Sequence, residues 1–156
     1  MSMMMGLTMD KFRKEICGLT KPCEGDHIVA GDMRIMDEET AQILSDQGVH
    51  WLDATAFRDS AVWTAAINEL AEKVDVIFLS VDADILAGEY VPAYFKAVPY
   101  GQSLETVKRN VRTVMGTGKV AAFSTFCFDF DNYFQGGPRT SESGAEIVRV
   151  GLESWK

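Results

Sequence analysis

Residues 74–84, VDVIFLSVDAD, decide the fold, because they join an apolar, β-branched run to two aspartates one residue apart. Residues 76–79 have no polar face, which is typical of a parallel strand covered on both sides. Asp82 and Asp84 follow at its C-terminal end, and side chains two residues apart in an extended segment point the same way. Ligands of open α/β sheets bind beyond the carboxyl ends of the strands. The pair therefore predicts the start of a site for a hard divalent cation.

Strands and helices alternate on both sides of this stretch. Strands are predicted at residues 27–30, 49–52, 74–84 and 119–130. Helices are predicted at residues 8–17, 38–47 with Asp37 as cap, 60–73 and 103–115 with Ser60 and Ser103 as caps, and from the SGAE capping box at 143–146 onward. The alternation predicts an α/β fold over residues 1–156: a single three-layer α-β-α domain with a parallel sheet of about four strands.

Composition restricts the classes of partner. The chain has 15 basic and 23 acidic residues, a net charge of −8, and no basic stripe, which argues against nucleic acid or an anionic membrane as partner. No apolar run approaches the ~20 residues that span a bilayer. Cys17, Cys23 and Cys127 follow no CxxC pattern and are interpreted as free thiols of a reducing, cytoplasmic compartment. A zinc site of Cys17, Cys23 and His27 is the alternative, although it lacks a fourth ligand.

A second carboxylate pair follows the last predicted strand. Cys127, Asp129 and Asp131 share one face of the strand exit, so Asp129 and Asp131 are candidates for metal or substrate binding. The alternative is that both are solvated residues at a strand end. His27 and His50 lie at the starts of predicted strands, the end opposite the carboxylates, and are expected to be packed or surface residues.

Residues 79–103, LSVDADILAGEYVPAYFKAVPYGQS, resemble the third metal motif of the ureohydrolases, the family of arginase, agmatinase and formiminoglutamase. In that family a strand ends in S-F-D-V-D-x-x-D-P, and the chain continues through a proline to P-x-G-G-x-[ST] before a helix. The matching residues are Ser80, Asp82, Asp84, Pro92, Pro99, Gly101 and Ser103. The resemblance covers nearly the whole chain but only the C-terminal half of the family's domain, which implies a partial arginase-like fold.

The resemblance implies a manganese-dependent hydrolase of linear C–N bonds in guanidino, amidino or formimino compounds, with a metal-activated water as nucleophile. Asp82 and Asp84 carry over as Mn²⁺ ligands. The family's GGDH and DAHxD motifs are absent, and Cys127 stands where the family has the glutamate that binds the guanidinium or amidine group. Mn²⁺ binding is therefore expected to be weak, and the chain to be inactive alone.

The resemblance also raises a question about the sheet. In the family, the DAHxD strand lies between the strands that correspond to residues 74–84 and 27–30. Without it, these two strands must pair directly, or another chain must fill the gap. If the monomer closes on itself, the predicted strand order is 119–130, 74–84, 27–30, 49–52, and an uncovered edge favours self-association.

Three functions remain open at this point. The first is a truncated or degenerate ureohydrolase-like domain that acts, if at all, on a small molecule. The second is a non-catalytic subunit or assembly module, either a homo-oligomer or a chain whose partner supplies the N-terminal half. The third is a Mn²⁺-dependent nucleotide-sugar transferase, because LSVDADIL also looks like the apolar strand and DxD motif of those enzymes.

Overall fold

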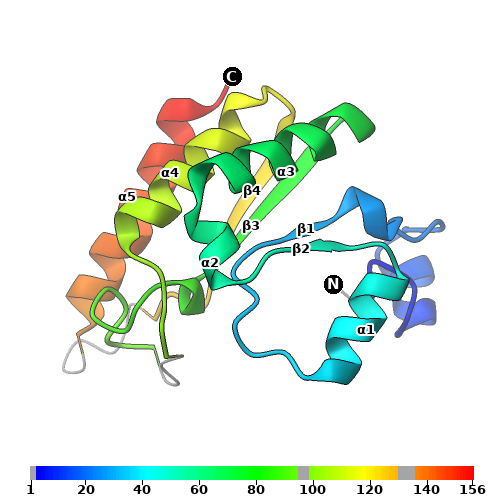
Figure 1. Cartoon of the computed structure of the whole chain (residues 1–156), viewed down its shortest axis with the longest axis horizontal. Helices are drawn as coiled ribbons and strands as arrows, with labels where there is room; N and C mark the ends of the chain where they lie inside the picture. Colours follow the sequence, from blue (N-terminus) through cyan, green and yellow to red (C-terminus); the bar gives the residue numbers. More distant parts are fainter. Residues whose placement is uncertain (1–2, 95–98, 130–135) are drawn as a thin grey trace.

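The computed structural model describes residues 3–94, 99–129 and 136–156, in which helices and parallel strands alternate along the chain (Figure 1). The strands are β1 (Val29–Ala30), β2 (His50–Trp51), β3 (Ile77–Asp82) and β4 (Val120–Phe126). The α-helices are α1 (Glu38–Asp46), α2 (Ala54–Arg58), α3 (Ser60–Lys73), α4 (Leu104–Gly116) and α5 (Gly137–Ser154). Short helical turns η1 (Phe12–Ile16), η2 (Gly25–His27) and η3 (Ala83–Ile85) connect them. The predicted α/β class is confirmed, whereas α2 was not predicted.

The strands form two separate parallel pairs, β1–β2 and β3–β4. These neighbours were predicted, but the predicted direct pairing of residues 74–84 with residues 27–30 is wrong: within the described residues, β1 and β3 share no ladder. The helices explain the gap. Helix α3 contacts β1 and also packs beside α4, whose buried residues share one core with β3. Packed helices lie ~8–10 Å apart, whereas hydrogen-bonded strands lie ~4.8 Å apart. Because α3 and α4 pack side by side, β1 and β3 are held too far apart to form a hydrogen-bonded ladder with each other.

Helices α3, α4 and α5 lie on the same side of the strands, with α1 on the other side beneath β1 and β2 (Figure 1). The main core includes residues of all three helices and of β3. A smaller core joins Leu44 of α1 to Ala30 and Val49 on the opposite face of β1–β2. Helices therefore cover both faces of β1–β2, the three-layer arrangement that was predicted.

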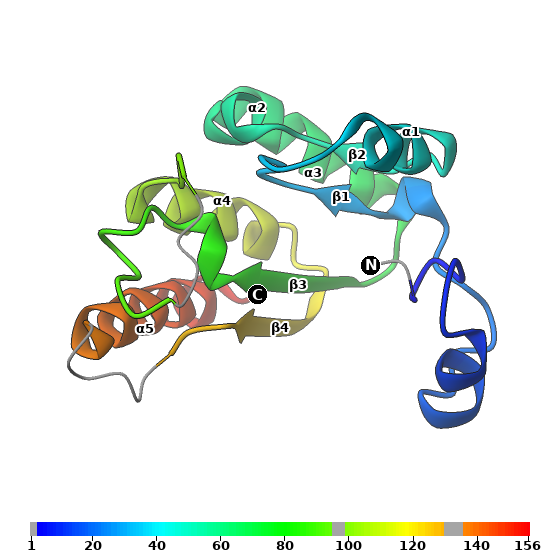
Figure 2. The same cartoon turned by 90° about the horizontal axis from the view of Figure 1, so that it is seen from below.

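The β3–β4 pair is covered on one face only. Ile77 and Val81 are buried at 6% and 5% exposure, whereas Val76, Phe78 and Phe126 are 65%, 52% and 48% exposed. The prediction that this strand is covered on both sides is therefore wrong for the described part of the chain. The reason is that α1 reaches only β1–β2, so nothing described lies over the second face of β3–β4 (Figure 2).

Two of the predicted helix caps are confirmed. The carboxylate of Asp37 accepts a hydrogen bond from the Thr40 N–H at 2.7 Å, and the Ser103 hydroxyl accepts one from Thr106 at 3.2 Å. The cap of α3 is Asp59 rather than Ser60, because its carboxylate accepts from the two N–H groups that follow Ser60. These bonds satisfy N–H groups that have no partner within the helix.

Helix α5 begins at Gly137, six residues before the predicted capping box at Ser143. Gly136 precedes it with φ of 91°, a conformation in which a side chain is strained. Ser143 is instead a fully buried interior residue whose hydroxyl donates to the Tyr90 carbonyl at 2.7 Å. The capping-box pattern thus marks a contact with the loop after β3.

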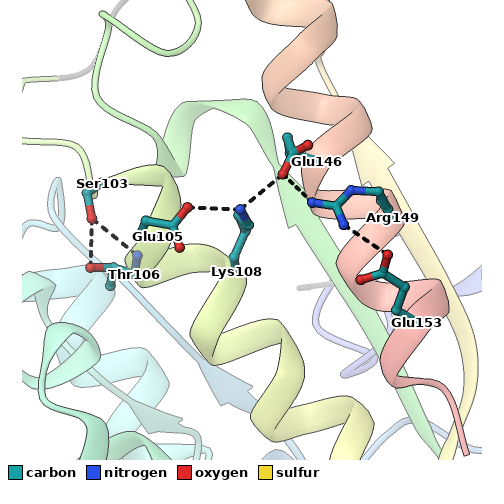
Figure 3. A network of polar contacts seen from close by, with 7 residues as sticks. All are labelled: Ser103, Glu105, Thr106, Lys108, Glu146, Arg149 and Glu153. Carbon is teal, nitrogen blue, oxygen red and sulfur yellow. Dashed lines mark hydrogen bonds and ion pairs between the residues drawn. The ribbon is translucent and has the colours of Figure 1, made fainter.

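An ion-pair network joins α4 to α5 (Figure 3). The mostly buried Lys108 ammonium lies 2.8 Å from Glu105 and 3.0 Å from Glu146. Arg149 continues the network, at 2.7 Å from Glu146 and 2.9 Å from Glu153. Hydrogen bonds from Arg149 and Lys108 lower the pKa of Glu146 to about 2.

The N-terminal segment differs from its prediction. A helix was predicted at residues 8–17, and only the π-helical turn η1 with the residues just before it is helical. Its apolar stripe is solvent-exposed, with Phe12 at 43% and Ile16 at 72%, while Arg13 is buried at 2%. No helix in the described ranges is long and apolar enough to cross a membrane.

Candidate functional site

Asp82 and Asp84 lie together at the C-terminal end of β3, as predicted. Asp82 is the last residue of the strand, and its Oδ1 accepts a hydrogen bond from the Asp84 N–H at 3.4 Å, which begins the turn η3. Asp82 is exposed and Asp84 is half-buried. The strand therefore ends in a tight turn that keeps both carboxylates at the same edge of the sheet.

Cys127 adds a thiol to this edge. Asp82 pairs with Phe126 across the β3–β4 ladder, so Cys127 follows directly beyond the matching end of β4. Its thiol donates to Asp82 Oδ2 with an Sγ–Oδ2 distance of 3.6 Å. Cys127 has φ of 60°, which is uncommon for a residue with a Cβ and turns the chain out of the strand. The predicted alternation through residue 130 is wrong in this respect, because β4 ends at Phe126.

The electrostatics of this edge are those of crowded negative charge. Burial raises the pKa of Asp84, and the nearby Asp82 charge raises it further, against the opposing effect of Arg34. Burial and the charges of Asp82 and Asp84 likewise raise the pKa of Cys127. The pKa of Tyr94 is raised by burial and by the charges of the same two carboxylates. A bound cation would relieve this repulsion.

A buried ion pair fixes the loop that carries Asp84. Arg34 Nε lies 2.7 Å from Asp32 Oδ2, with side chains 8% and 1% exposed. At this distance and burial, the charges of the two side chains interact with little screening by water. The guanidinium also donates to the backbone carbonyls of Asp84 and Pro99. Arg34, which follows β1, thereby ties the β1–β2 half of the molecule to the loop after β3.

Gln102 also connects the loop after β3 to the β1–β2 half of the molecule. Its side chain is fully buried, and its Nε2 donates to Asp32 Oδ1 at 2.6 Å and to the Ala54 carbonyl at 3.1 Å. Burial raises the pKa of Asp32, and the Gln102 hydrogen bond and the Arg34 charge oppose that rise. Sequence reasoning missed Arg34, Asp32 and Gln102 as positioning residues. The only indication was the GDMR segment that follows a strand, and it does not show a contact 70 residues away.

Three of the remaining predicted residues lie in the described part of the chain. Asp129 is half-buried beyond β4, and Asp131 lies outside the described residues. His27 ends the turn η2 and His50 begins β2, so both lie at the strand starts, as predicted. No imidazole is therefore close to Asp82 in the described chain, which contains both histidines of the sequence.

A second polar group lies at that opposite end. Ligand atoms of Glu24, Asp26 and His27 lie within 4.8 Å of one another, and they are the one such group among the residues that the structure describes. Cys17 and Cys23 do not join His27 in this way, so the zinc alternative is not formed here. A hollow of about 120 Å³ lies beside Asp26, between β1, β2 and α3. This hollow lies near the starts of β1 and β2, at the end of the strands opposite Asp82.

The donors at the β3 edge fit a hard cation only in part. Two carboxylates are ligands that Mn²⁺ accepts, whereas the thiol beside them is a soft ligand that Mn²⁺ disfavours. Among the residues that the structure describes, the site offers fewer protein ligands than the four to six that a tightly held ion takes.

The sequence profile described as "Arginase family" matches residues 6–150. This chain belongs to the arginase family. A formimidoylglutamase from Psychrobacter cryohalolentis is 38% identical over 56 residues, which are 36% of this chain and 16% of that protein. The predicted ureohydrolase resemblance is confirmed at the level of the superfamily.

Solved structures of other proteins contain the fold of this chain within part of their length. The Helicobacter pylori arginase aligns with a TM-score of 0.79 at 16% identity, covering 97% of this chain and 55% of that one. The Bacillus subtilis formimidoylglutamase aligns with a TM-score of 0.75 at 19% identity, covering 84% and 42%. A Trypanosoma cruzi formiminoglutamase with Mn²⁺ aligns with a TM-score of 0.69 at 15% identity, covering 86% and 47%. The arginase-family chain therefore spans about half the length of these relatives.

Proposed function

We propose that this chain is part of a manganese-dependent ureohydrolase-type domain, in which Asp82 and Asp84 are metal ligands, and that it does not hydrolyse C–N bonds by itself. The observation that supports this proposal is the carboxylate pair at the C-terminal end of β3, with both histidines near the N-terminal ends of the strands. A pair of bound manganese ions would supply a hydroxide nucleophile at neutral pH. Two aspartates and a thiol do not hold such a pair.

The residues of this chain have definite tasks in that proposal. Asp82 and Asp84 supply oxygen ligands, and the Asp82 hydrogen bond to the Asp84 N–H keeps the two on one turn. Arg34 and Gln102 hold that turn through the buried Asp32. The class of substrate, a guanidino, amidino or formimino compound, comes from the relatives.

The test is turnover by the purified chain loaded with Mn²⁺. Urea release from arginine and agmatine and formamide release from formiminoglutamate should stay at the background rate. Hydrolysis at enzyme-like rates, above about 1 s⁻¹, would contradict the proposal. Isothermal titration should detect weak Mn²⁺ binding that Asp82→Asn and Asp84→Asn remove. Asp75→Asn is the control, because Asp75 is exposed near the other end of β3.

A second candidate is an assembly module whose remaining half comes from elsewhere. It is favoured by the two unpaired strand edges of β1 and β3 and by the exposed apolar face with Val76, Phe78 and Phe126. Unpaired edges and apolar faces bind other polypeptides. Co-expression with the N-terminal half of a formimidoylglutamase should give a soluble complex with Mn²⁺-dependent activity. Absence of any complex would count against this candidate.

The nucleotide-sugar transferase alternative stays a prediction that the family match does not support. Hydrolysis or transfer of a nucleoside-diphosphate sugar in the presence of Mn²⁺ would revive it. We expect no such reaction, because the described fold has the arrangement of the arginase relatives over most of its length.

A further inference from the structure

Residues 3–22 form an N-terminal arm whose polarity is the reverse of an ordinary protein surface. Its charged residue Arg13 is only 2% exposed, and the guanidinium donates to the Leu19 carbonyl and pairs with Asp10 inside the arm. The apolar side chains face solvent instead, at 37–72% exposure: Met4, Leu7, Met9, Phe12, Ile16 and Leu19. Apolar side chains gathered on the outside of one short segment mark a surface that binds another polypeptide.

The arm is attached to the rest of the molecule at its base. Met5 is buried in the smaller core with Leu44 and Val49, and the Cys23 N–H donates to the Met4 carbonyl at 2.8 Å. Figure 2 shows the arm, in dark blue, projecting from the molecule beside the start of β1. The arm therefore has a fixed base and presents its apolar side chains outward.

The bare face of the β3–β4 pair, with Val76, Phe78 and Phe126, is a second apolar surface of the same chain. These side chains are 65%, 52% and 48% exposed, so the arm of the same molecule leaves them uncovered. Asp75 lies just before β3 and Asp82 at its end, and both are exposed. The bare face is thus apolar along the strands and carries carboxylates at both ends of β3.

The arm and the bare face also have opposite charge. Four of the 15 basic residues and two of the 23 acidic residues lie in residues 1–22, a net charge of +2. The other residues hold 11 basic and 21 acidic side chains, a net charge of −10. Lys119, at the start of β4, donates to backbone carbonyls at the end of α3. The arm is therefore a basic, apolar segment on an otherwise acidic chain, and it complements the bare face in both respects.

We propose that the N-terminal arm of one copy covers the bare β3–β4 face of a second copy. In a closed two-fold pair, each copy gives its own arm and receives the arm of the other, so the contact is made twice. Both contacts count toward the roughly 1,200–2,000 Å² that a specific interface buries. The inference goes beyond the proposed metal-binding role, and it names the occupant that the assembly module leaves open.

The test is disulfide trapping between two variants of the full chain. The arm variant keeps Cys17, an exposed residue of the arm, and carries Cys23→Ser and Cys127→Ser. The face variant carries Ser80→Cys, with all three native cysteines replaced by serine and an affinity tag to distinguish its mass. Ser80 is exposed and lies an even number of residues from Phe78, so its side chain is on the bare face.

Mild oxidation of the mixed variants should give a disulfide-linked dimer that contains one chain of each kind. Binding of the arm to the face raises the local concentration of the two thiols, so the mixed dimer should form at least about ten times faster than with a control. The matched control replaces Ser80→Cys by Thr64→Cys, which places the thiol on the exposed side of α3. A mixed dimer that forms no faster than with the Thr64→Cys control would overturn the inference.

Sedimentation velocity measures the same contact without a disulfide. Ile16→Asp removes an apolar side chain that is 72% exposed and adds a charge of the wrong sign to the arm. It should raise the dissociation constant of the pair at least about tenfold. Thr64→Asp adds the same charge to α3 and should leave the constant unchanged, and unchanged melting temperatures verify that both variants are folded. Equal dissociation constants for Ile16→Asp and the unmodified chain would contradict the exchange.

Two further results would assign the arm elsewhere. A chain that stays monomeric, yet sediments with anionic lipid vesicles unless it carries Ile16→Asp, would make the arm a membrane contact and overturn the inference. If the chain forms a complex with the N-terminal half of a formimidoylglutamase but gives no mixed disulfide above the control, the assembly module stands and this inference falls. Mn²⁺ binding through Asp82 and Asp84 is measured separately and is independent of both results.

Discussion

The two strand pairs of this molecule differ in length and in how helices cover them. The β1–β2 pair has α3 on one face and α1 on the other, and its strands are only two residues long. The β3–β4 pair is longer and carries the candidate metal ligands, yet one of its faces is bare. The strand pair with the candidate metal ligands is thus the pair that described helices cover on only one face.

At two positions of this strand, the environment that the sequence pattern predicts differs from the environment in the described chain. Val76 and Phe78 are apolar in the pattern of a strand covered on both sides, but they are more than half exposed. A sequence that has to keep such positions in contact with water gains nothing from apolar residues there. The proposed assembly module accounts for these apolar residues, because another polypeptide segment would cover them.

The largest expected effect concerns the tie between the two halves. Arg34→Met leaves the Asp32 carboxylate buried without its counter-charge, and the free energy of unfolding should fall by about 3–5 kcal/mol. Urea denaturation measures this. Adding Asp32→Asn should recover much of the loss, because it removes the uncompensated charge. The exposed ion pairs of Arg149 provide the control, since Arg149→Met should cost less than about 1 kcal/mol. Equal losses of unfolding free energy for Arg34→Met and Arg149→Met would contradict the prediction that Arg34 holds the two strand pairs together.

The next effect compares adjacent residues on opposite faces of β3. Ile77→Ala removes buried side-chain volume and should cost about 2–4 kcal/mol. Phe78→Ala removes a larger side chain from the bare face and should change stability by no more than about 0.5 kcal/mol. Urea denaturation of both variants measures the two losses, at a chain concentration low enough to keep the protein monomeric. A Phe78→Ala loss as large as that of Ile77→Ala would show that the face is covered in solution.

The bare face should also promote self-association. The unmodified chain is expected to form oligomers in a concentration-dependent way, and Phe78→Lys should raise the dissociation constant at least about tenfold. Sedimentation velocity at several concentrations measures the shift. Thr64→Lys adds the same charge to the exposed side of α3 and should leave the association unchanged. A strictly monomeric chain at all concentrations would contradict this prediction.

The smallest effect belongs to the network between α4 and α5, which lies away from the sheet edges. The pKa of Glu146 is about 2 in the folded chain, below its ordinary value of 4.5. A lowered folded-state pKa stabilises the protein above the unfolded-state pKa, and this contribution is lost as the pH falls from about 4.5 toward 2. Glu146→Gln should therefore lower the melting temperature slightly at pH 7 and have less effect near pH 3. Glu72→Gln, at an exposed α3 carboxylate, should show no such trend.

Local sequence patterns predicted the parts of the fold that depend on local interactions. The caps Asp37 and Ser103 were found because each needs only neighbours within three residues, whereas the predicted extended segment ends at Asp82 and Asp84 lies in the turn η3. The start of α5 was misplaced for the opposite reason. Ser143 and Glu146 have the spacing of a capping box, but one contacts the Tyr90 carbonyl and the other the Lys108 ammonium.

The rest of the candidate site depends on distant contacts. The Gln102–Asp32 hydrogen bond spans 70 residues and the Cys127–Asp82 contact spans 45, so no periodicity predicts either one. The strand order was wrong at one point, because it assumed that every strand finds a partner within the chain. The packing distance between α3 and α4 instead keeps β1 and β3 too far apart to pair.

The two open edges have a direction as well as a position. Strands β1 and β3 run roughly the same way, and each already has a parallel partner on its other side (Figure 2). A strand that continues this parallel order cannot arrive by a tight hairpin from either one, because parallel strands need a crossover of about a dozen residues or more. For the proposed assembly module, a strand that filled the gap in parallel order would therefore come from a separately connected segment. The direction of β1 and β3 would set the direction in which that segment runs.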